Sequence, residues 1–329
     1  MWIIYVLLVL LASLWLYARL TCGRCVCPRD RVSGKTVVIT GGNAGIGRCV
    51  STELVRGGAN LIIGCRNTAK AESLKLECAE KGFKGKIQVL HLDLQSFASV
   101  RKFAQEVIGI SPSIDVLINN AALGVPEEIV KSEDNFEVTF QTNYLSPVLL
   151  THLLLPIIKR DGGRIVNVSS IQHLMGSEVR LAKNKTCPRR IMCFGSFVYG
   201  DTKLAMNYWT RTLAQRLAGT GITVNCCHPG FVLTDIFSHS YGNIAHFSLR
   251  LLANIYAKTP EEGAQTIVHL VLSRNASIIS GKYWSDCAEV RFPRRPLKKS
   301  TAAILWRNTM EQCGIEEDDR QREEMSGSR

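Results

Sequence analysis

Short runs of aliphatic and β-branched residues alternate with amphipathic stretches along most of this 329-residue chain. The apolar runs predict strands over residues 36–40, 61–63, 87–92, 114–118, 164–168 and 222–227. The stretches between them predict helices up to residue 56 and over 68–81, 96–108 and 202–218, with a long apolar helix before residue 164. Because strands and helices alternate with short connections, the strands are expected to lie parallel, with helices on both faces. The alternation therefore predicts an α/β fold on one doubly wound parallel sheet of about seven strands.

The positive charge of the chain is concentrated outside this alternating body. There are 40 Lys and Arg against 28 Asp and Glu, a formal charge of +12. Most of the charge lies in three basic patches over residues 19–35, 179–190 and 291–307, whereas the tail from residue 308 is acidic. A nucleic-acid protein spreads basic residues over a docking face, so nucleic acid is not an expected partner. The hydrophobic share of 46% excludes global disorder.

An apolar run opens the chain from Trp2 to Ala18, with Ser13 as its one strongly polar member. Its length covers most of a hydrocarbon core. Arginines from Arg19 onward follow the run and none precedes it, so the positive-inside rule places its C-terminal side in the cytosol. We interpret residues 1–20 as an uncleaved membrane anchor and residues 21–34 as a basic juxtamembrane linker. The alternative is a cleaved signal peptide, which needs a basic start and a small-residue cleavage site, and neither is clear.

Twelve cysteines are spread over the chain, and in the cytosol they are expected to stay reduced. Cys22, Cys25 and Cys27 directly follow the predicted anchor, which leaves open whether they are palmitoylated. No second ligand pair with suitable spacing accompanies them, so the sequence predicts neither a zinc site nor another metal site.

A glycine-rich turn, Gly41-Gly42-Asn43-Ala44-Gly45-Ile46-Gly47, follows the first predicted strand. Glycines between a buried strand and a helix let backbone N–H groups approach a pyrophosphate. The spacing differs from the Gly-x-Gly-x-x-Gly of many dinucleotide-binding folds, and an ordinary strand-to-helix turn is the alternative.

The second predicted strand ends in Gly64-Cys65-Arg66, where an NAD site has an acid for the ribose hydroxyls. A guanidinium at that place can hold a 2′-phosphate through two hydrogen bonds. Arg66, with Arg48 as a helper, therefore favours NADP(H). The alternative is that Arg66 is a solvated residue at the end of a strand.

Further motifs follow in order: Asn119-Asn120-Ala121-Ala122, Asn143, Ser169-Ser170 and Tyr199-x-x-x-Lys203. With the glycine turn, they make residues 34–315 resemble the short-chain dehydrogenase/reductase family. Within it, the chain is most similar to the membrane-anchored retinol dehydrogenase and retinal reductase group, which also carries an insertion like the one over 174–192. The resemblance implies a Rossmann-type fold and nicotinamide-dependent oxidoreductase activity.

The resemblance points to Asn143, Ser170, Tyr199 and Lys203 as the catalytic residues. A free tyrosine has a pKa of about 10, too high for an efficient base at neutral pH. Lys203 lies one helical turn after Tyr199, so its ammonium is expected to lower that pKa; the resemblance implies that it also holds the nicotinamide ribose. Tyr199 would exchange a proton with the substrate oxygen, which Ser170 would polarise. Asn143 would complete a water-mediated proton relay, and the alternative is that it is a helix-breaking buried amide.

The predicted cofactor contacts lie mainly in the loops that follow the strands. They are Gly41, Asn43, Gly45, Ile46, Gly47, Arg66, Asp93, Leu94, Asn120, Ala121, Tyr199, Lys203, Pro229, Gly230, Val232 and Thr234. In the family, Thr234 would contact the nicotinamide carboxamide. Neighbouring residues have structural interpretations. Asn119 supports the central loop, with ligand binding as an equal alternative; Ser169 caps or faces the core; and His228 is expected to fix its loop, with a role as a base as the alternative. His173 is a weaker candidate for the substrate pocket.

Residues 231–258 hold many apolar side chains where this family builds its substrate lid. An apolar lid suits a lipophilic carbonyl or alcohol, and the alternative is that these residues only pack the lid. Gly281-Lys-Tyr-Trp284 resembles the last strand of the family. A helix over about 301–313 is expected to pack on the body or lie on the membrane, and the charged tail over 316–329 is expected to be disordered.

Together these features predict a catalytic domain over 35–315, held at the endoplasmic reticulum membrane by the N-terminal anchor and the basic patches, and facing the cytosol. It would be an NADP(H)-dependent oxidoreductase for a lipophilic aldehyde or ketone and its alcohol, with retinal and retinol as the leading pair. The alternatives are a steroid or general lipid carbonyl reductase and, from another class, a non-catalytic membrane-tethered NADP-binding protein. The direction of the reaction and a homo-oligomeric state stay open.

Overall fold

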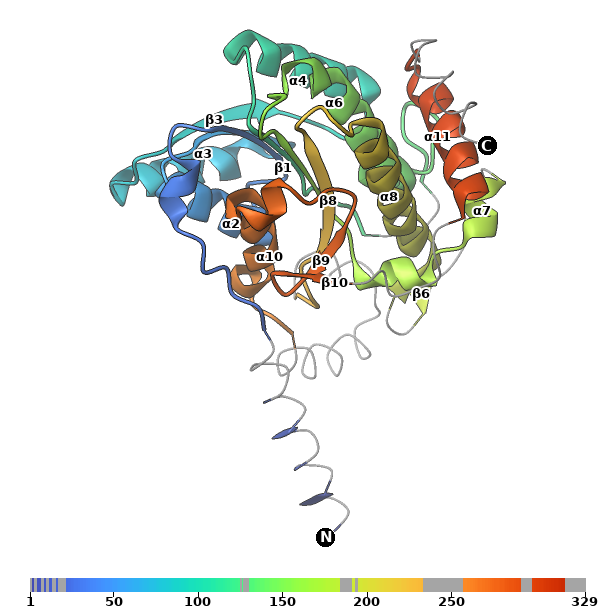
Figure 1. Ribbon diagram of the computed structural model, residues 1–329, viewed down its shortest axis with the longest axis horizontal. Helices are drawn as coiled ribbons and strands as arrows, with labels where there is room; N and C mark the ends of the chain where they lie inside the picture. The colour runs from blue at the N-terminus through green and yellow to red at the C-terminus, as the bar shows by residue number, and fades with distance from the viewer. Residues whose placement is uncertain are drawn as a thin grey trace.

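In the computed structural model, the described part of the chain comprises residues 22–124, 126, 130–183, 191–192, 195–232, 257–290 and 298–316, with single positions before residue 22. Its main sheet has eight strands in the order β10-β9-β8-β5-β4-β1-β2-β3 (Figure 1). They are β1 Thr36–Thr40, β2 Asn60–Cys65, β3 Lys86–His91, β4 Val116–Asn119, β5 Arg164–Val168, β8 Thr223–His228, β9 Tyr283–Ser285 and β10 Ala288–Val290. The short strands β6 Ile191–Met192 and β7 Gly195–Ser196 pair separately.

Seven of these strands are parallel, which confirms the predicted doubly wound sheet. The prediction missed the eighth strand, β10, which pairs antiparallel with β9 at the edge of the sheet. Asp286 and Cys287 connect β9 to β10 with φ angles of 52° and 61°. Two positive φ angles in succession are typical of a tight hairpin turn. Such turns usually contain Asn-Gly or Asp-Gly, and the absence of that signal explains why the sequence did not predict β10.

Helices cover both faces of the sheet. The longer ones are α2 Gly45–Arg56, α3 Thr68–Glu80, α4 Phe97–Ile110, α6 Ser146–Leu154, α8 Phe197–Arg216, α10 Pro260–Leu272 and α11 Lys299–Cys313. The shorter ones are α5 Val138–Phe140, α7 Glu178–Ala182, the π-helical turn η2 Gln141–Leu145 and the 3-10 turns η1 Arg29–Val32, η3 Leu155–Ile157, η4 Ile171–Met175 and η6 Asn275–Ser277. Figure 1 shows α2 and α10 on one side of the strands and α4, α6 and α8 on the other.

Neighbouring residues of one strand belong to different cores. Val37 packs in the core under α2, α3 and α10, whereas Val38 packs in the core under α4, α6 and α8. Successive side chains of a strand point to opposite faces, so a sheet covered on both sides requires apolar residues at every position. This explains the continuous apolar runs in the sequence.

The strand order reverses beside β1, whose neighbours are β2 on one side and β4 on the other. In such sheets a crevice for ligands forms outside the carboxyl ends of the strands at this point. The loops after β1 and β4 therefore hold the position where a dinucleotide is expected.

The segment predicted as a linker is packed on the body from residue 22 onward. The backbone N–H of Gly23 donates to the Asp286 carboxylate at 3.2 Å, and that of Cys25 donates to Gln265 Oε1 at 3.2 Å. The Cys25 side chain is buried. Most of the predicted anchor over 1–20 lies outside the described residues, and no helix within the described residues is both long and apolar enough to span a bilayer.

Other predicted segments are placed in part. In the insertion over 174–192, Arg180 of α7 forms an ion pair with buried Asp201 of α8 at 2.6 Å, while 184–190 lies outside the described residues. The same holds for 233–256, which is most of the predicted lid, and for the tail from 317. α11 packs on the body, with Trp306 3% exposed and Thr309 Oγ1 2.8 Å from the hydroxyl of Tyr144.

Candidate active site

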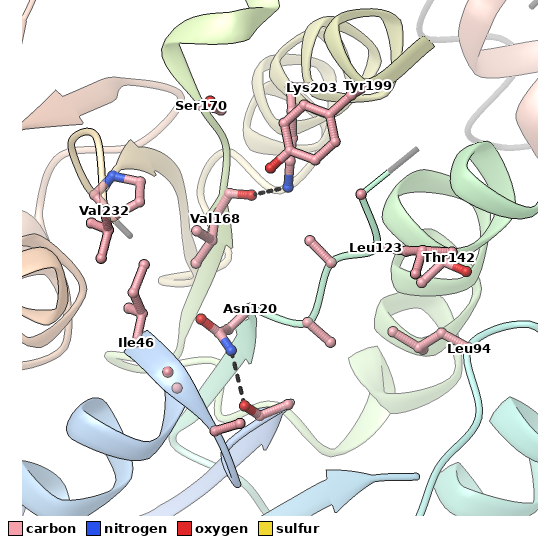
Figure 2. Close-up of a pocket in the computed structure, with 18 of the residues that line it drawn as sticks. Ile46, Leu94, Asn120, Leu123, Thr142, Val168, Ser170, Tyr199, Lys203 and Val232 are labelled. Carbon is pink, nitrogen blue, oxygen red and sulfur yellow. Dashed lines mark hydrogen bonds between the residues drawn. The ribbon is translucent and has the colours of Figure 1, made fainter. Parts of the chain in front are cut away.

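A cavity of about 630 Å³ lies at the carboxyl ends of the central strands. Figure 2 shows side chains from the loops after β1, β4 and β5 and from α8 directed into it. It brings together most of the predicted site residues: Gly41, Asn43, Gly45, Ile46, Gly47, Arg66, Asp93, Leu94, Asn120, Ala121, Ser170, Tyr199, Lys203, Pro229, Gly230 and Val232. Asn143 is beside the cavity without lining it, and Thr234 lies outside the described residues.

The glycine turn is shaped by positions that tolerate no side chain. Gly41 and Gly45 have φ angles of 67° and 49°, which disfavour residues with a Cβ. A Cβ on Gly47 would lie 2.1 Å from the carbonyl oxygen of Gly41 and 2.6 Å from Asn120 Nδ2. The Asn120 amide also donates to the carbonyl oxygen of Thr40 at 2.9 Å and to that of Gly41 at 3.3 Å (Figure 2), so the loop after β4 holds the turn after β1.

This turn fits a pyrophosphate. α2 begins at Gly45, and its N-cap residue Ala44 provides no side-chain cap. The first N–H groups of the helix are therefore available to an anion, and the positive end of the helix dipole favours it. A dinucleotide thus fits the geometry of the cavity at this end.

Arg66 supplies a positive charge to the same end of the cavity. It follows β2 directly, is exposed and lines the cavity. Arg48, the second basic residue considered from the sequence, forms an ion pair with Glu77 of α3 and does not line the cavity. Of these two arginines, only Arg66 lines the cavity.

Tyr199 and Lys203 share one helix because α8 starts at Phe197, earlier than the predicted residue 202. Lys203 is buried, and its Nζ donates to the carbonyl oxygen of Val168 at 2.8 Å (Figure 2). The same Nζ lies 5.3 Å from the centre of the Tyr199 ring. Burial lowers the pKa of Lys203 to about 8.

The pKa of Tyr199 is raised by burial. This is opposite to the lowering expected from Lys203, because loss of solvation disfavours the tyrosinate and the lysine proton is directed to Val168. Burial therefore favours the protonated form of the Tyr199 hydroxyl. Ser170 stands at the end of β5 beside it, and its hydroxyl oxygen accepts a hydrogen bond from the N–H of Gln172 at 3.2 Å.

Asn143 lies in η2, the π-helical turn between α5 and α6. Its side-chain oxygen accepts from the N–H of Leu123 at 2.6 Å, and its Nδ2 donates to the Leu123 carbonyl oxygen at 2.9 Å. Nδ2 is also 3.5 Å from Thr202 Oγ1 on α8. π-helical turns often occur at functional sites, and here the turn presents an amide that fixes a cavity-lining loop.

The neighbouring residues take the expected structural roles. Asn119 Nδ2 donates to Thr151 Oγ1 at 3.0 Å and to Asn167 Oδ1 at 2.8 Å, and the Ser169 hydroxyl donates to the carbonyl oxygen of Lys203 at 3.5 Å. Burial lowers the pKa of His228 to about 4, and its Nδ1 accepts from the N–H of Ile171 at 3.3 Å.

His173 is packed away from the cavity. Its Nδ1 lies 2.6 Å from the carbonyl oxygen of Ser170, and its ring is 5.1 Å from that of Tyr283. It therefore supports the Ser170 backbone and does not line the described pocket.

Two residues that help to shape the site, Val168 and Lys258, were not predicted from the sequence. The carbonyl oxygen of Val168 is the acceptor for Lys203, and a backbone atom carries no residue-specific signal. Lys258 lies so close to Gly230 that a Cβ on Gly230 would be 2.5 Å from Lys258 Cδ. Lys258 also forms an ion pair with Asp286. That pair joins the loop after β8 to the β9–β10 turn, and no local pattern could have indicated it.

Known proteins share both the sequence and this architecture. Residues 35–182 and 190–243 match the family model described as short chain dehydrogenase. The chain is 39% identical to human (Homo sapiens) retinol dehydrogenase 14 over 332 residues, covering 92% of this chain and 94% of that protein. It is 38% identical to mouse (Mus musculus) retinol dehydrogenase 12 over 287 residues, covering 87% and 88%.

Solved structures agree with this relationship. A putative uncharacterized protein from Mycobacterium paratuberculosis has a TM-score of 0.65 and 29% identity, covering 89% of this chain and 98% of that one. A blue fluorescent protein from a metagenomic library, in complex with NADPH, has a TM-score of 0.60 and 25% identity, covering 77% and 96%.

Proposed function

Because the chain belongs to the short-chain dehydrogenase family and is an NADP(H)-dependent oxidoreductase, we propose that it interconverts a lipophilic aldehyde or ketone and the corresponding alcohol. Retinal and retinol are the leading pair. One observation carries the proposal: Ser170, Tyr199 and Lys203 reach a single cavity whose other end is formed by the glycine turn and Arg66.

The mechanism assigns one role to each side chain. The glycine turn and Arg66 would hold NADPH, which would supply the hydride for the carbonyl carbon. Tyr199 donates its hydroxyl proton to the carbonyl oxygen, and its raised pKa keeps that proton in place at neutral pH. Ser170 donates a hydrogen bond to the same oxygen and stabilises the charge that develops there. In alcohol oxidation, the proton moves back to Tyr199.

Lys203 and Asn143 prepare this arrangement. Lys203 is fixed by the Val168 carbonyl oxygen, and its positive charge stabilises the tyrosinate that remains after proton transfer. Asn143 holds the Leu123 backbone at the side of the cavity and belongs to the proposed proton relay. Its contact with Thr202 brings it to the helix that carries Tyr199 and Lys203.

Arg66 determines the proposed cofactor preference. Its guanidinium follows β2, at the place where the adenosine ribose is expected, and can hold a 2′-phosphate through two hydrogen bonds. Asp93 and Leu94 after β3 lie on the same side and form the proposed adenine pocket. On the far side, Pro229, Gly230 and Val232 form the nicotinamide side, to which Thr234 is assigned.

The proposed substrate class rests on two observations. The relatives with 38–39% identity over most of their length are named retinol dehydrogenases. The segment over 231–258 is rich in apolar residues and follows the nicotinamide-side loop. A lipophilic substrate agrees with the proposed anchor over 1–20, which would hold the enzyme on the cytosolic face of the endoplasmic reticulum. A steroid or general lipid carbonyl reductase is the second candidate.

The test is NADPH consumption by the full chain, purified in detergent, with a panel of retinoid, steroid and aliphatic carbonyls. Turnover of retinal at the highest kcat/KM supports the leading pair, and a preference for a steroid carbonyl supports the second candidate. Tight binding of NADPH without turnover of any carbonyl, or of any matching alcohol with NADP, would mean a non-catalytic NADP-binding protein. Protease treatment of sealed microsomes tests orientation: a fully protected domain contradicts the cytosolic assignment.

A further inference from the structure

Two cysteines and a histidine from distant parts of the sequence meet outside the catalytic cavity. Cys25 and Cys27 lie in the segment before β1, and His269 lies in the last turn of α10. Their two Sγ atoms and one ring nitrogen all lie within 4.8 Å of one another, and Cys27 Sγ is 3.9 Å from His269 Nδ1. Among the described residues, this is the one group of three or more His, Cys, Asp or Glu side chains close enough to share a metal ion.

The backbone around the two cysteines is fixed in place. The N–H of Cys25 donates to Gln265 Oε1 of α10 at 3.2 Å. Arg29 donates from Nη1 to the Cys27 carbonyl oxygen at 3.0 Å and approaches Cys25 Sγ at 3.3 Å. Cys25 is buried, whereas Cys27 and His269 are half-buried. The three ligand atoms are thus brought together by the fold, and two of the three side chains are partly exposed to solvent.

The chemistry of the three groups suits a borderline-soft divalent cation. Thiolates and neutral imidazole are the usual ligands of Zn²⁺, whereas Mg²⁺ and Ca²⁺ prefer oxygen. Coordination requires the thiolate form of each cysteine and the neutral form of the imidazole, so binding an ion would displace the thiol protons.

Three arginines lie near the site. Arg29 forms an ion pair with Glu53 at 2.7 Å, which balances its charge, whereas Arg31 acts electrostatically on Cys27 and Arg164 on His269. The N–H groups of Arg29 can donate to a metal-bound sulfur, as outer-shell groups commonly do around metal ligands. Two thiolates neutralise the two charges of Zn²⁺, so that binding releases two protons and leaves a site without net charge.

We propose that Cys25, Cys27 and His269 bind Zn²⁺ as three protein ligands, with a water molecule in the fourth position of the tetrahedral site. None of the three lines the catalytic cavity. The ion would fasten the segment after the predicted anchor to α10, which packs extensively against α2, the helix that begins at the glycine turn. It would therefore hold the catalytic body in a fixed relation to its N-terminal segment and stabilise the fold.

The test uses the full chain in detergent, with thiols kept reduced and metals removed by a chelator. Titration with Co²⁺ should give thiolate-to-cobalt charge-transfer absorption that saturates at one ion per chain and is displaced by Zn²⁺. Cys27→Ser and His269→Gln should each weaken binding by at least about 100-fold, since loss of a ligand exceeds the roughly 10- to 100-fold effect of outer-shell changes. Cys49→Ser is the matched control, because Cys49 is another half-buried thiol, on α2 beside Glu261, and it should bind as the wild type.

A second measurement keeps the test independent of activity. Zn²⁺ should protect Cys25 and Cys27 from alkylation, read by mass spectrometry, and should raise the unfolding temperature of the wild type and Cys49→Ser but not of Cys27→Ser. Cys27 is half-buried, so its replacement should leave the fold intact even if His269→Gln does not fold. The proposal is overturned if the reduced wild type gives no cobalt–thiolate absorption, or if Cys27→Ser binds as tightly as the wild type.

Discussion

The ammonium group of Lys203 donates a hydrogen bond of 2.8 Å to the carbonyl oxygen of Val168. The bond joins the first half of α8, which carries Tyr199, to the last residue of β5. Ser170 follows β5 two residues later. Because Lys203 is buried, this carbonyl oxygen is the acceptor that offsets the lost solvation of its charge. The bond therefore sets the relative position of the proposed proton donor and the group that polarises the substrate.

Replacing Tyr199 by Phe removes the proposed proton donor and leaves the ring in place. We expect kcat for carbonyl reduction to fall about 10²- to 10⁴-fold, the usual contribution of general acid catalysis, with NADPH affinity largely unchanged. Tyr208→Phe is the matched control, because Tyr208 is buried on the same helix, away from the cavity. Steady-state kinetics and cofactor fluorescence measure both effects, and unchanged turnover in Tyr199→Phe would exclude Tyr199 as the acid.

Replacing Arg66 by Ala should separate the two cofactors. Loss of charge-assisted hydrogen bonds to a 2′-phosphate should weaken NADPH binding by about 10- to 100-fold and leave NADH binding nearly unchanged. Arg56→Ala serves as control, since Arg56 is exposed at the end of α2 and outside the cavity. Titration of each variant with both cofactors is the measurement, and equal losses for NADPH and NADH would refute the assignment.

Replacing Gly47 by Ala should disrupt the cradle for the pyrophosphate. The added Cβ would lie 2.1 Å from the Gly41 carbonyl oxygen, so the turn must shift, at a cost of about 1–3 kcal/mol in stability and with a large loss of cofactor affinity. Gly109→Ala is the matched control on α4, where a Cβ meets nothing within 4 Å, and it should stabilise the protein by up to about 1 kcal/mol. Chemical denaturation and NADPH titration test both, and normal NADPH affinity in Gly47→Ala would contradict this account.

The stability of the protein should depend on pH through Lys203. Burial lowers its pKa from 10.5 to about 8, so the folded state binds the proton less tightly than the unfolded state. The resulting cost is fully present below pH 8 and disappears as the pH rises toward 10.5. Relative to Lys203→Met, the unfolding free energy of the wild type should therefore rise by about 3 kcal/mol over that interval.

Denaturation at a series of pH values measures this difference without the cofactor. Lys84→Met is the control, since Lys84 is exposed in the loop before β3, and its difference from the wild type should stay flat. A flat difference for Lys203→Met as well would mean that burial does not perturb Lys203.

The fold and much of the proposed site could be predicted because their signals are local. The apolar runs of β1 and its neighbours had to be buried on both faces. Positive φ angles favour glycine at 41 and 45, and a close backbone approach excludes a Cβ at 47. Tyr199 and Lys203 are four residues apart, which places them on one side of any helix. The family followed from these motifs, and the family model and relatives confirm it. The cofactor class followed from them as well and agrees with a solved structure of similar fold bound to NADPH.

Contacts between residues far apart in sequence were decided by the tertiary structure. The pairing of Lys203 with Val168, the hold of Asn143 on Leu123 and the approach of His269 to Cys27 depend on how strands and helices pack. The rise in the pKa of Tyr199 also depends on burial, which no spacing encodes. The sequence by itself determined which chemical groups are available; packing decided which of them meet, because each partner is set by elements that come together only in the folded chain.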